Sequence, residues 1–308
     1  MKKITILIFV VIALSQSSKA QQDPQFSQNM FNRLFVNPAS AGASGAYCGS
    51  LLYRSQWAGY DPSGQPKTGV LSLDGPVKFL HGGLGLNVLS DQLGFEKTIG
   101  VKLAYSFHLN VGESGKLGIG LDAGYMQKSI DGKKYKPNDP NDPFVPTQTI
   151  KGSIIPDLGA GIYYAGNKLY AGISATHLTE GEIDLTVTKY NLARHIYGTL
   201  GYRFDLSPTI GLTPSVFVKN DGATTQLDGN LMAMFNDKFW LGASYRLEDA
   251  IVVMAGFNVM NGLRIGYSYD ITSSQLKNYS DGSHEVTLGY CFNPKKKPIL
   301  RNINVRYL

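Results

Sequence analysis

The sequence is poor in charge, in cysteine and in long apolar runs. Charged residues make up 17% of its 308 residues, whereas soluble proteins contain roughly 25%. Two cysteines are too few for a disulfide scaffold, and a hydrophobic share of 43% excludes a disordered chain. Beyond residue 20, no stretch approaches the ~18 consecutive apolar residues of a transmembrane helix. Glycine, in contrast, is abundant, with 35 residues.

Residues 1–20 are typical of a secretory signal peptide. Lys2 and Lys3 precede an apolar run over residues 4–14 that is too short to span a bilayer. Ser18 and Ala20 provide the small residues of a cleavage site. The alternative is an uncleaved N-terminal anchor, which the short apolar run disfavours.

The formal net charge of +6 comes from the two ends of the chain. Removal of residues 1–20 takes away three lysines and leaves +3. The stretch 294–308 carries +5 and no acidic residue, so residues 21–293 together carry about −2. Because no basic face remains on the body of the chain, we expect no nucleic-acid partner.

Apolar and polar residues alternate along almost the whole chain from residue 46 onward. Between Val101 and Leu109, one face carries Val, Leu, Tyr, Phe and Leu, and the other carries Lys, Ala, Ser and His. This period of two predicts β-strands, and no long segment has the spacing of an amphipathic helix. We predict about fourteen strands: 46–57, 68–76, 82–90, 98–110, 115–129, 156–165, 168–177, 194–206, 209–219, 225–235, 239–247, 251–259, 263–270 and 284–292.

The predicted connections alternate in length. The first, third, fifth, seventh and thirteenth are long, whereas the sixth, eighth, tenth and twelfth are tight. Long loops on one side, short turns on the other and an even number of strands are typical of an outer-membrane barrel. A soluble β-sandwich would share the short strands but would not require loops that alternate in length. We therefore predict an all-β fold, a transmembrane antiparallel β-barrel over residues 46–293, with both termini in the periplasm.

Glycine gathers on the strand face opposite the apolar one. In a barrel this face lines the lumen, where small side chains leave room for a plug or other luminal contents. The glycines are Gly83, Gly85, Gly118, Gly120, Gly124, Gly159, Gly161, Gly172, Gly242 and Gly289.

Residues 21–45 do not alternate. Phe26, Met30 and Leu34 share one helical face, and Asn37-Pro38 would end such a helix. Two positions are open for this segment. It could fold into the lumen as a hatch or plug, or it could lie along the periplasmic rim.

The same segment resembles the opening of the PorP/SprF family of type IX secretion and gliding proteins. Members open, after a signal peptide, with a pattern like Asp-Pro-Gln-Phe-Ser-Gln-Tyr-Met-Phe-Asn-Pro-Leu-Phe-Tyr-Asn-Pro-Ala-Tyr-Ala-Gly. The chain matches at 23–28, 30–32, 34–35, 37–39 and 41–42, and it departs at Asn29, Arg33, Val36 and Ser40. Its ending, Val305-Arg306-Tyr307-Leu308, is similar to the family's Pro-Arg-Tyr-Leu type of terminus.

The resemblance implies an outer-membrane barrel similar to the fatty-acid-transporter type, with an N-terminal hatch and without enzymatic activity. It implies that the barrel holds the C-terminal domain of an exported surface protein or adhesin. It also implies a link to periplasmic type IX or peptidoglycan-linked components, in the outer-membrane lipid of a Gram-negative bacterium. The alternative is a hatch-gated passive transporter of hydrophobic or small polar solutes.

Partner contacts are expected on loops 130–155, 178–193 and 271–283, in the N-terminal segment and in the basic periplasmic tail 294–308. The tail either docks on the secretion machinery or packs on the rim and against anionic headgroups. The candidate partner-binding residues are Phe26, Met30, Phe31, Asn37, Pro38, Lys295, Lys296, Lys297, Arg306 and Tyr307.

The sequence shows no pattern of a catalytic or metal site. None of the serines lies in a Gly-x-Ser-x-Gly elbow, and neither His-Glu-x-x-His nor Cys-x-x-Cys occurs. Carboxylates cluster at 138–143, but they lack the ligand spacing of a known calcium loop. We expect no catalytic residue, no cofactor and no metal.

The two cysteines lie near the ends of the predicted barrel. Cys48 is early in the first strand and Cys291 is late in the last, and both have inward parity. Barrel closure pairs these strands, so a disulfide across the seam is possible in an oxidising compartment. A shift of one residue in register would separate the two thiols, and we therefore expect them to be free in the lumen.

Overall fold

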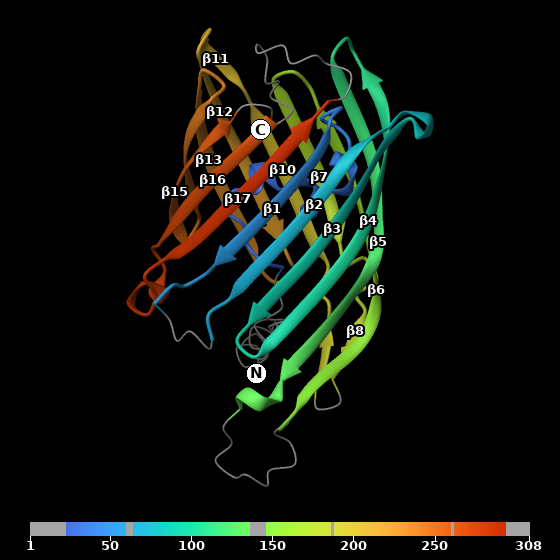
Figure 1. The fold of residues 1–308 in the computed structure, drawn as a ribbon, viewed down its shortest axis with the longest axis vertical. Helices are drawn as coiled ribbons and strands as arrows, with labels where there is room; N and C mark the ends of the chain where they lie inside the picture. The colour runs from blue at the N-terminus through green and yellow to red at the C-terminus, as the bar shows by residue number, and fades with distance from the viewer. Residues whose placement is uncertain (1–22, 60–63, 136–145, 186–187, 260–261, 294–308) are drawn as a thin grey trace, which may run out of the picture.

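The computed structural model describes residues 23–59, 64–135, 146–185, 188–259 and 262–293. Within these ranges, one closed antiparallel sheet forms a β-barrel with fourteen wall strands (Figure 1). Each wall strand pairs with its neighbours in the chain, and β1 pairs with β17 to close the barrel. The barrel predicted from the period-two pattern is thereby confirmed.

The strands of the wall differ about twofold in length. They are β1 (Tyr47–Ser55), β2 (Lys67–Val77), β3 (Gly82–Leu93), β4 (Glu96–Val111), β5 (Gly115–Asp131), β6 (Thr149–Ala165), β7 (Leu169–Thr176), β10 (His195–Tyr202) with β11 (Phe204–Ser207), β12 (Ile210–Asn220), β13 (Thr225–Phe235), β14 (Phe239–Arg246), β15 (Ala250–Val259), β16 (Leu263–Thr272) and β17 (Ser283–Phe292). Both β10 and β11 pair with β12, so they are two parts of one wall strand. Two further short strands, β8 (Glu182–Asp184) and β9 (Lys189–Asn191), form a separate hairpin between β7 and β10.

Burial along the strands is the reverse of that in a soluble protein. On β5, the Leu121 side chain is 64% exposed, whereas the adjacent Asp122 is 3% exposed. The largest fully buried side chains include Arg54, Arg246 and Glu285. Apolar side chains therefore face outward, where lipid contacts them, and polar side chains face the lumen. No helix within the described ranges is long and apolar enough to cross a bilayer.

The two ends of the barrel carry different connections. At one end, which we name the turn end, β2, β4 and β6 are joined to the strands that follow them by residues 78–81, 112–114 and 166–168. At the opposite loop end, β1, β5 and β7 are followed by the longer connections 56–66, 132–148 and 177–194. This difference confirms the predicted alternation for most of the barrel.

The third connection differs from the prediction. We expected a long loop there, but only Gly94 and Phe95 separate β3 from β4. The reason is that the two strands stay paired as far as Leu93 and Glu96, beyond the predicted strand ends at residues 90 and 98.

The seam of the barrel holds a disulfide. Cys48 and Cys291 are direct partners in the pairing of β1 with β17, and their sulfurs are bonded. Our expectation of free luminal thiols is therefore wrong, because the register places the two residues opposite each other without an offset. The bond covalently joins the first wall strand to the last.

Residues 23–46, here named the luminal segment, lie inside the barrel (Figure 1). The segment contains three short helical turns, η1 (Asn29–Phe31), α2 (Arg33–Val36) and η2 (Pro38–Ser40). The single helix predicted through Phe26, Met30 and Leu34 is thus wrong. The backbone is instead held by side chains of the wall, which a pattern of apolar residues does not reveal.

The segment runs from the loop end of the lumen to the turn end. Asp23 contacts His195, the first residue of β10, whereas Asn293, just after β17, contacts Gly45. The first and last described residues therefore lie at opposite ends of the barrel. This is because the chain crosses the lumen before it enters β1. The termini themselves, which we expected on one side of the membrane, lie outside the described residues, and their position stays a prediction.

Candidate functional site

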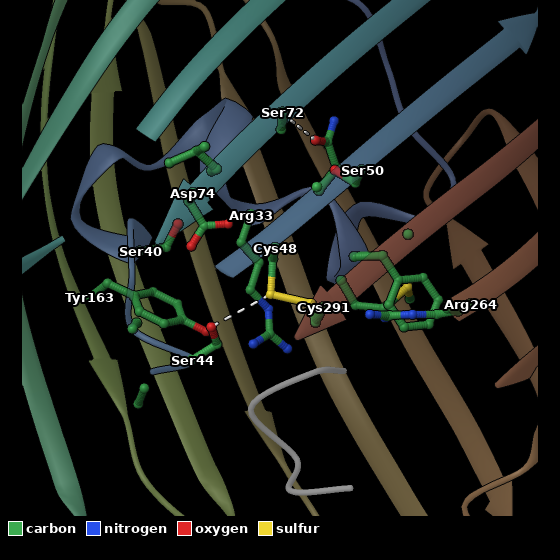
Figure 2. Close-up of a pocket in the computed structure, with 18 residues that line it drawn as sticks. Arg33, Ser40, Ser44, Cys48, Ser50, Ser72, Asp74, Tyr163, Arg264 and Cys291 are labelled. Carbon is green, nitrogen blue, oxygen red and sulfur yellow. Dashed lines mark hydrogen bonds between the residues drawn. A yellow bond between two sulfur atoms is a disulfide. The ribbon is translucent and has the colours of Figure 1, made fainter. Parts of the chain in front are cut away.

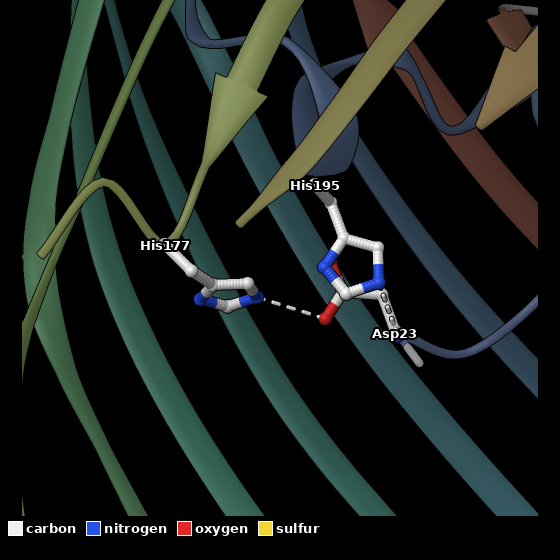
Figure 3. Close-up of side chains that lie close together, drawn as sticks. All are labelled: Asp23, His177 and His195. Atoms are coloured by element: carbon white, nitrogen blue, oxygen red, sulfur yellow. Dashed lines mark hydrogen bonds and ion pairs between the residues drawn. The ribbon is translucent and has the colours of Figure 1, made fainter. Parts of the chain in front are cut away.

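The loop-end anchor of the luminal segment is built around Asp23 (Figure 3). Its carboxylate lies 2.9 Å from His177 Nε2 and accepts a hydrogen bond of 2.6 Å from Tyr197. Its backbone N–H donates to His195 Nε2, and its carbonyl accepts from Lys219 Nζ. Side chains from β10 and β12, and one from the connection after β7, thus hold a single residue through four of its polar atoms.

The two ionisable groups of this anchor stabilise each other's charge. Burial alone would raise the pKa of Asp23, but His177, His195 and Tyr197 together lower that pKa well below its usual range. Burial alone would lower the pKa of His177, but the carboxylates of Asp23 and Asp157 raise it to about 9. At neutral pH the anchor is therefore an ion pair between an aspartate and an imidazolium.

Asp23, His177 and His195 also bring ligand atoms within 4.8 Å of one another, as a metal site would. The ring nitrogens of His177 are both engaged, Nδ1 by Asp157 and Nε2 by Asp23. His195 Nδ1 lies 2.9 Å from the Ala193 carbonyl. Every ring nitrogen in the cluster thus has a protein partner, so the geometry fits an anchor for the segment better than a cation site.

A second anchor lies deeper in the lumen, at Ser27 and Gln28. The two backbone N–H groups donate to the Glu285 carboxylate at 2.9 and 2.8 Å. The Ser27 hydroxyl donates to Asp270 at 2.6 Å and accepts from Arg54 at 2.8 Å. Glu285 and Asp270 are almost fully buried, so these contacts lie away from bulk water.

Arginines from the wall balance the charge of this anchor. Arg54 pairs with both Asp270 and Glu285, at 2.7 and 3.2 Å. Arg246 pairs with Asp270 at 2.9 Å and with Asp228 at 3.3 Å. Because each buried charge has an opposite partner, loss of one partner would leave another charge uncompensated, at a cost of about 3–5 kcal/mol.

Apolar residues of the segment fill apolar patches on the inward face of the wall. Phe26 packs in a cluster with Leu52, Val70 and Leu89, whose side chains point into the lumen. Met30 belongs to a second cluster that contains Trp240 of β14. The segment is therefore held by packing as well as by polar contacts.

The middle of the segment rests on wall glycines. A Cβ atom on Gly120 would lie 2.3 Å from the Ala39 nitrogen, and one on Gly83 would lie 2.3 Å from the Ala41 carbonyl. A Cβ on Gly161 would meet the Asn37 side chain at 2.3 Å. The inward glycines predicted to leave luminal space therefore provide the surface against which this chain packs.

Neighbouring wall residues satisfy the segment's backbone carbonyls. Asn87 donates to the Leu34 carbonyl at 3.0 Å, and Ser174 donates to that of Val36 at 2.6 Å. Ser106 donates to the Ala39 carbonyl at 2.8 Å. These bonds replace the regular helical hydrogen bonds that the segment lacks.

The sequence model described as the type IX secretion system membrane protein PorP/SprF matches residues 18–290 of the chain. The chain belongs to the PorP/SprF family. A comparison with curated proteins finds no match.

Solved structures with a similar fold include a channel and a transporter of low sequence identity. The monoaromatic hydrocarbon channel CymD is 11% identical, with a TM-score of 0.50, over 86% of this chain and 92% of that one. The toluene transporter TbuX of Ralstonia pickettii is 9% identical, with a TM-score of 0.50, over 85% and 93%. At these identities the likeness extends to the fold of the PorP/SprF barrel, which is an outer-membrane barrel, and not to its function.

The candidate partner-binding residues in the N-terminal segment of this PorP/SprF barrel face the wall. Phe26, Met30, Asn37 and Pro38 are buried, and Phe31 is partly buried against Trp240. The remaining candidates, Lys295, Lys296, Lys297, Arg306 and Tyr307, lie outside the described residues. The role of all ten as partner contacts stays a prediction.

Sequence reasoning missed the residues that hold the segment. Arg54, Asp270 and Glu285 stand at inward positions of their strands. The alternation along each strand therefore predicted that these charged side chains face the lumen. Which charges meet, and that Ser27 lies among them, depends on strand register and on the path of the segment. Neither is encoded in a local pattern.

One predicted partner loop makes extensive contacts with the barrel itself. In the connection 177–194, Ile183 and Leu185 are fully buried in a cluster with Ile130 and Ile155. Tyr190 donates a hydrogen bond to Glu96, and its ring lies 4.2 Å from Lys128 Nζ. The β8–β9 hairpin therefore folds back over one side of the loop end.

Proposed function

We propose that this chain is a non-enzymatic barrel of the type IX secretion or gliding machinery. It would bind the C-terminal domain of an exported surface protein, such as an adhesin, and link that protein to periplasmic components. The proposal rests on the position of the luminal segment inside the barrel. Because residues 23–46 occupy the lumen and are anchored at Asp23 and at Ser27, the segment acts as a plug, and the barrel works at its ends.

The turn end is proposed to face the periplasm and the loop end to face outward. Short turns in the periplasm and long loops outside are the usual arrangement of outer-membrane barrels. With this orientation, the stretch 294–308 follows β17 on the periplasmic side, where its charge of +5 suits acidic partners or anionic headgroups. The cargo domain would then meet connections 177–194 and 273–282 on the outer side.

The buried candidates act in this proposal only when the plug leaves the lumen. Phe26, Met30, Asn37 and Pro38 are covered by the wall, so a partner reaches them only after the anchors at Asp23 and Ser27 have opened. The first contacts of a periplasmic partner are instead assigned to Lys295, Lys296, Lys297, Arg306 and Tyr307.

Affinity purification in mild detergent tests the proposal. Full-length protein should co-purify with a secreted surface protein and with periplasmic type IX or peptidoglycan-linked components. A variant that lacks 294–308 should insert normally and keep the cargo but lose the periplasmic partner. A matched variant with Lys295, Lys296 and Lys297 replaced by glutamine separates charge from length. If the full-length protein retains none of these proteins, the proposal is wrong.

The second candidate function is passive transport of hydrophobic or small polar solutes. Two observations favour it: the fold neighbours named as a hydrocarbon channel and a toluene transporter, and an apolar groove of about 590 Å3 on the outer wall. The groove lies near the turn end, between Leu73, Leu84 and Tyr290. Liposome swelling separates the two functions, since a transporter admits solute without any secretion component.

A further inference from the structure

A cavity of about 100 Å3 lies between the luminal segment and the wall at the turn end (Figure 2). Asn32 and Arg33 of the segment line it on one side. Tyr163 of β6, Arg264 of β16 and the Cys48–Cys291 disulfide line it on the others. The cavity is separate from the anchors at Asp23 and Ser27, and neither anchor residue lines it.

Hydrogen-bond donors around this cavity lack protein acceptors. In the described part of the chain, Arg33 Nε and Nη2, Arg264 Nη1 and Asn32 Nδ2 are buried atoms without a hydrogen-bond partner. The Tyr163 hydroxyl is likewise unpartnered, and Tyr163 and Asn32 are only 2% and 5% exposed. Buried donors of this kind are costly unless an acceptor meets them.

The two arginines differ from the others in the barrel. Six arginines fall within the described ranges, and Arg54, Arg194, Arg203 and Arg246 each form an ion pair with a carboxylate. No such pair is formed by Arg33 or Arg264 within those ranges, and both line this one cavity. The cavity therefore has an excess of positive charge.

Aromatic rings fix the orientation of both guanidinium groups. The Arg33 guanidinium carbon lies 4.2 Å from the centroid of the Tyr170 ring, and that of Arg264 lies 4.3 Å from the Phe31 ring. Stacking occupies a face of each planar group and leaves its N–H edges free for hydrogen bonds. Such edges match the two oxygens of a carboxylate or the oxygens of a phosphate.

One acidic side chain also lines the cavity, Asp74 of β2. Its Oδ2 accepts a hydrogen bond of 2.8 Å from the Gly42 backbone, which ties the end of the luminal segment to the wall. Even with Asp74 ionised, two guanidinium groups leave one positive charge in excess. The Asp74 carboxylate therefore lowers the net positive charge of the cavity but does not neutralise it.

We infer that this cavity is an oxyanion-binding site, which takes a single carboxylate or phosphate group between Arg33 and Arg264. The carboxylate would come from a peptide or small acid, and the phosphate from a free or esterified phosphate. The volume of the cavity admits one such group and excludes a folded domain. The site goes beyond the proposed function, because it depends on neither a secretion partner nor a solute path.

Calorimetric titration of the full-length protein in detergent tests the inference. The probes are inorganic phosphate and N-acetylglycine, with N-acetylglycinamide as the neutral control. We expect saturable binding of at least one anion and none of the amide. Binding of phosphate alone or of N-acetylglycine alone supports the site and identifies the source of its oxyanion. Absence of saturable binding for both anions overturns the inference.

Variants locate the binding. The double variant Arg33→Gln with Arg264→Gln should lower the affinity for the anion at least about tenfold. Arg194→Gln, which removes one positive charge from an exposed ion pair at the loop end, should leave the affinity unchanged. Arg33→Lys keeps the charge but loses the planar fork, and we expect an intermediate affinity that remains measurable if the double variant fails to fold. Equal affinity in Arg33→Lys, the double variant and the wild type would overturn the assignment.

Discussion

His177 Nε2 lies 2.9 Å from Asp23 Oδ1, which joins the first described residue of the luminal segment to the wall of the barrel. Asp157 lies 2.9 Å from the other ring nitrogen of His177, so the imidazolium sits between two carboxylates. Because neither His177 nor Asp23 belongs to a wall strand, this contact is a point where the segment could be released without breaking the barrel.

The anchor should weaken as the pH rises. The pKa of His177 is raised to about 9, so its contribution is complete below an unfolded pKa of about 6.5 and is lost as the pH rises through about 9. The pKa of Asp23 is lowered, so its contribution is present above about 3.8 and is lost only in stronger acid. After correction for intrinsic exchange rates, protection of residues 23–30 against hydrogen exchange should therefore be greatest between about pH 4 and 6.5.

A variant separates this anchor from general effects of pH. His177→Gln keeps a polar side chain but removes the titration, so exchange of residues 23–30 should become faster at pH 6 and lose most of its pH dependence. An identical rise in exchange from pH 6 to pH 10 in both proteins, after correction for intrinsic rates, would contradict the role given to His177.

Removal of one charge from the deeper anchor should be costly. Glu285→Gln leaves Arg54 without one of its two carboxylates, and we expect a loss of about 3–5 kcal/mol in the free energy of unfolding. Glu180→Gln is the matched control, because its partner Arg194 is about half exposed and screened by water. A urea titration, monitored by heat-modifiable migration on gels, measures the unfolding midpoints of both variants. Similar midpoints for the two variants would show that the buried network contributes little.

A methyl group on the wall should displace the luminal segment. Gly120→Ala places a Cβ 2.3 Å from the Ala39 nitrogen, and overpacking of this kind costs about 1–3 kcal/mol. Hydrogen exchange at residues 37–42 should accelerate by about tenfold or more. Gly229→Ala is the control, since a Cβ there meets no atom within 4 Å. Unchanged exchange in the first variant would mean that the segment does not rest on β5.

The seam disulfide should be detectable directly. Mass spectrometry of non-reduced peptides is expected to find Cys48 linked to Cys291. Replacement of both by serine should lower the free energy of unfolding by about 2–4 kcal/mol. Two thiols that can be alkylated in the unreduced protein would refute the bond.

The wall of the barrel was predictable from the sequence, because outward and inward residues alternate and the alternation is a local signal. Val101 to Leu109 shows it clearly. The inward glycines were also readable as a luminal face. The contents of the lumen were not predictable in detail, since Ser27 and Gln28 donate to Glu285, more than 250 residues later in the chain. Such contacts depend on the closed barrel.

The cavity between Arg33 and Arg264 was likewise not predictable from the sequence. Arg33 stands at a position where the family's opening pattern has proline, so the resemblance gave no expectation for it. Arg264 alternates with apolar neighbours like any luminal residue. Only closure of the barrel brings it to the same cavity as Arg33. In the same way, the seam bond required a register that parity alone left open.

We propose that the luminal segment closes the barrel, which then works at its ends. Conductance in planar bilayers shows whether the lumen is closed, when wild-type protein is compared with a variant that lacks residues 23–42. We expect no steady conductance for the wild type and a steady open channel for the variant. Equal, steady conductance in both proteins would contradict it.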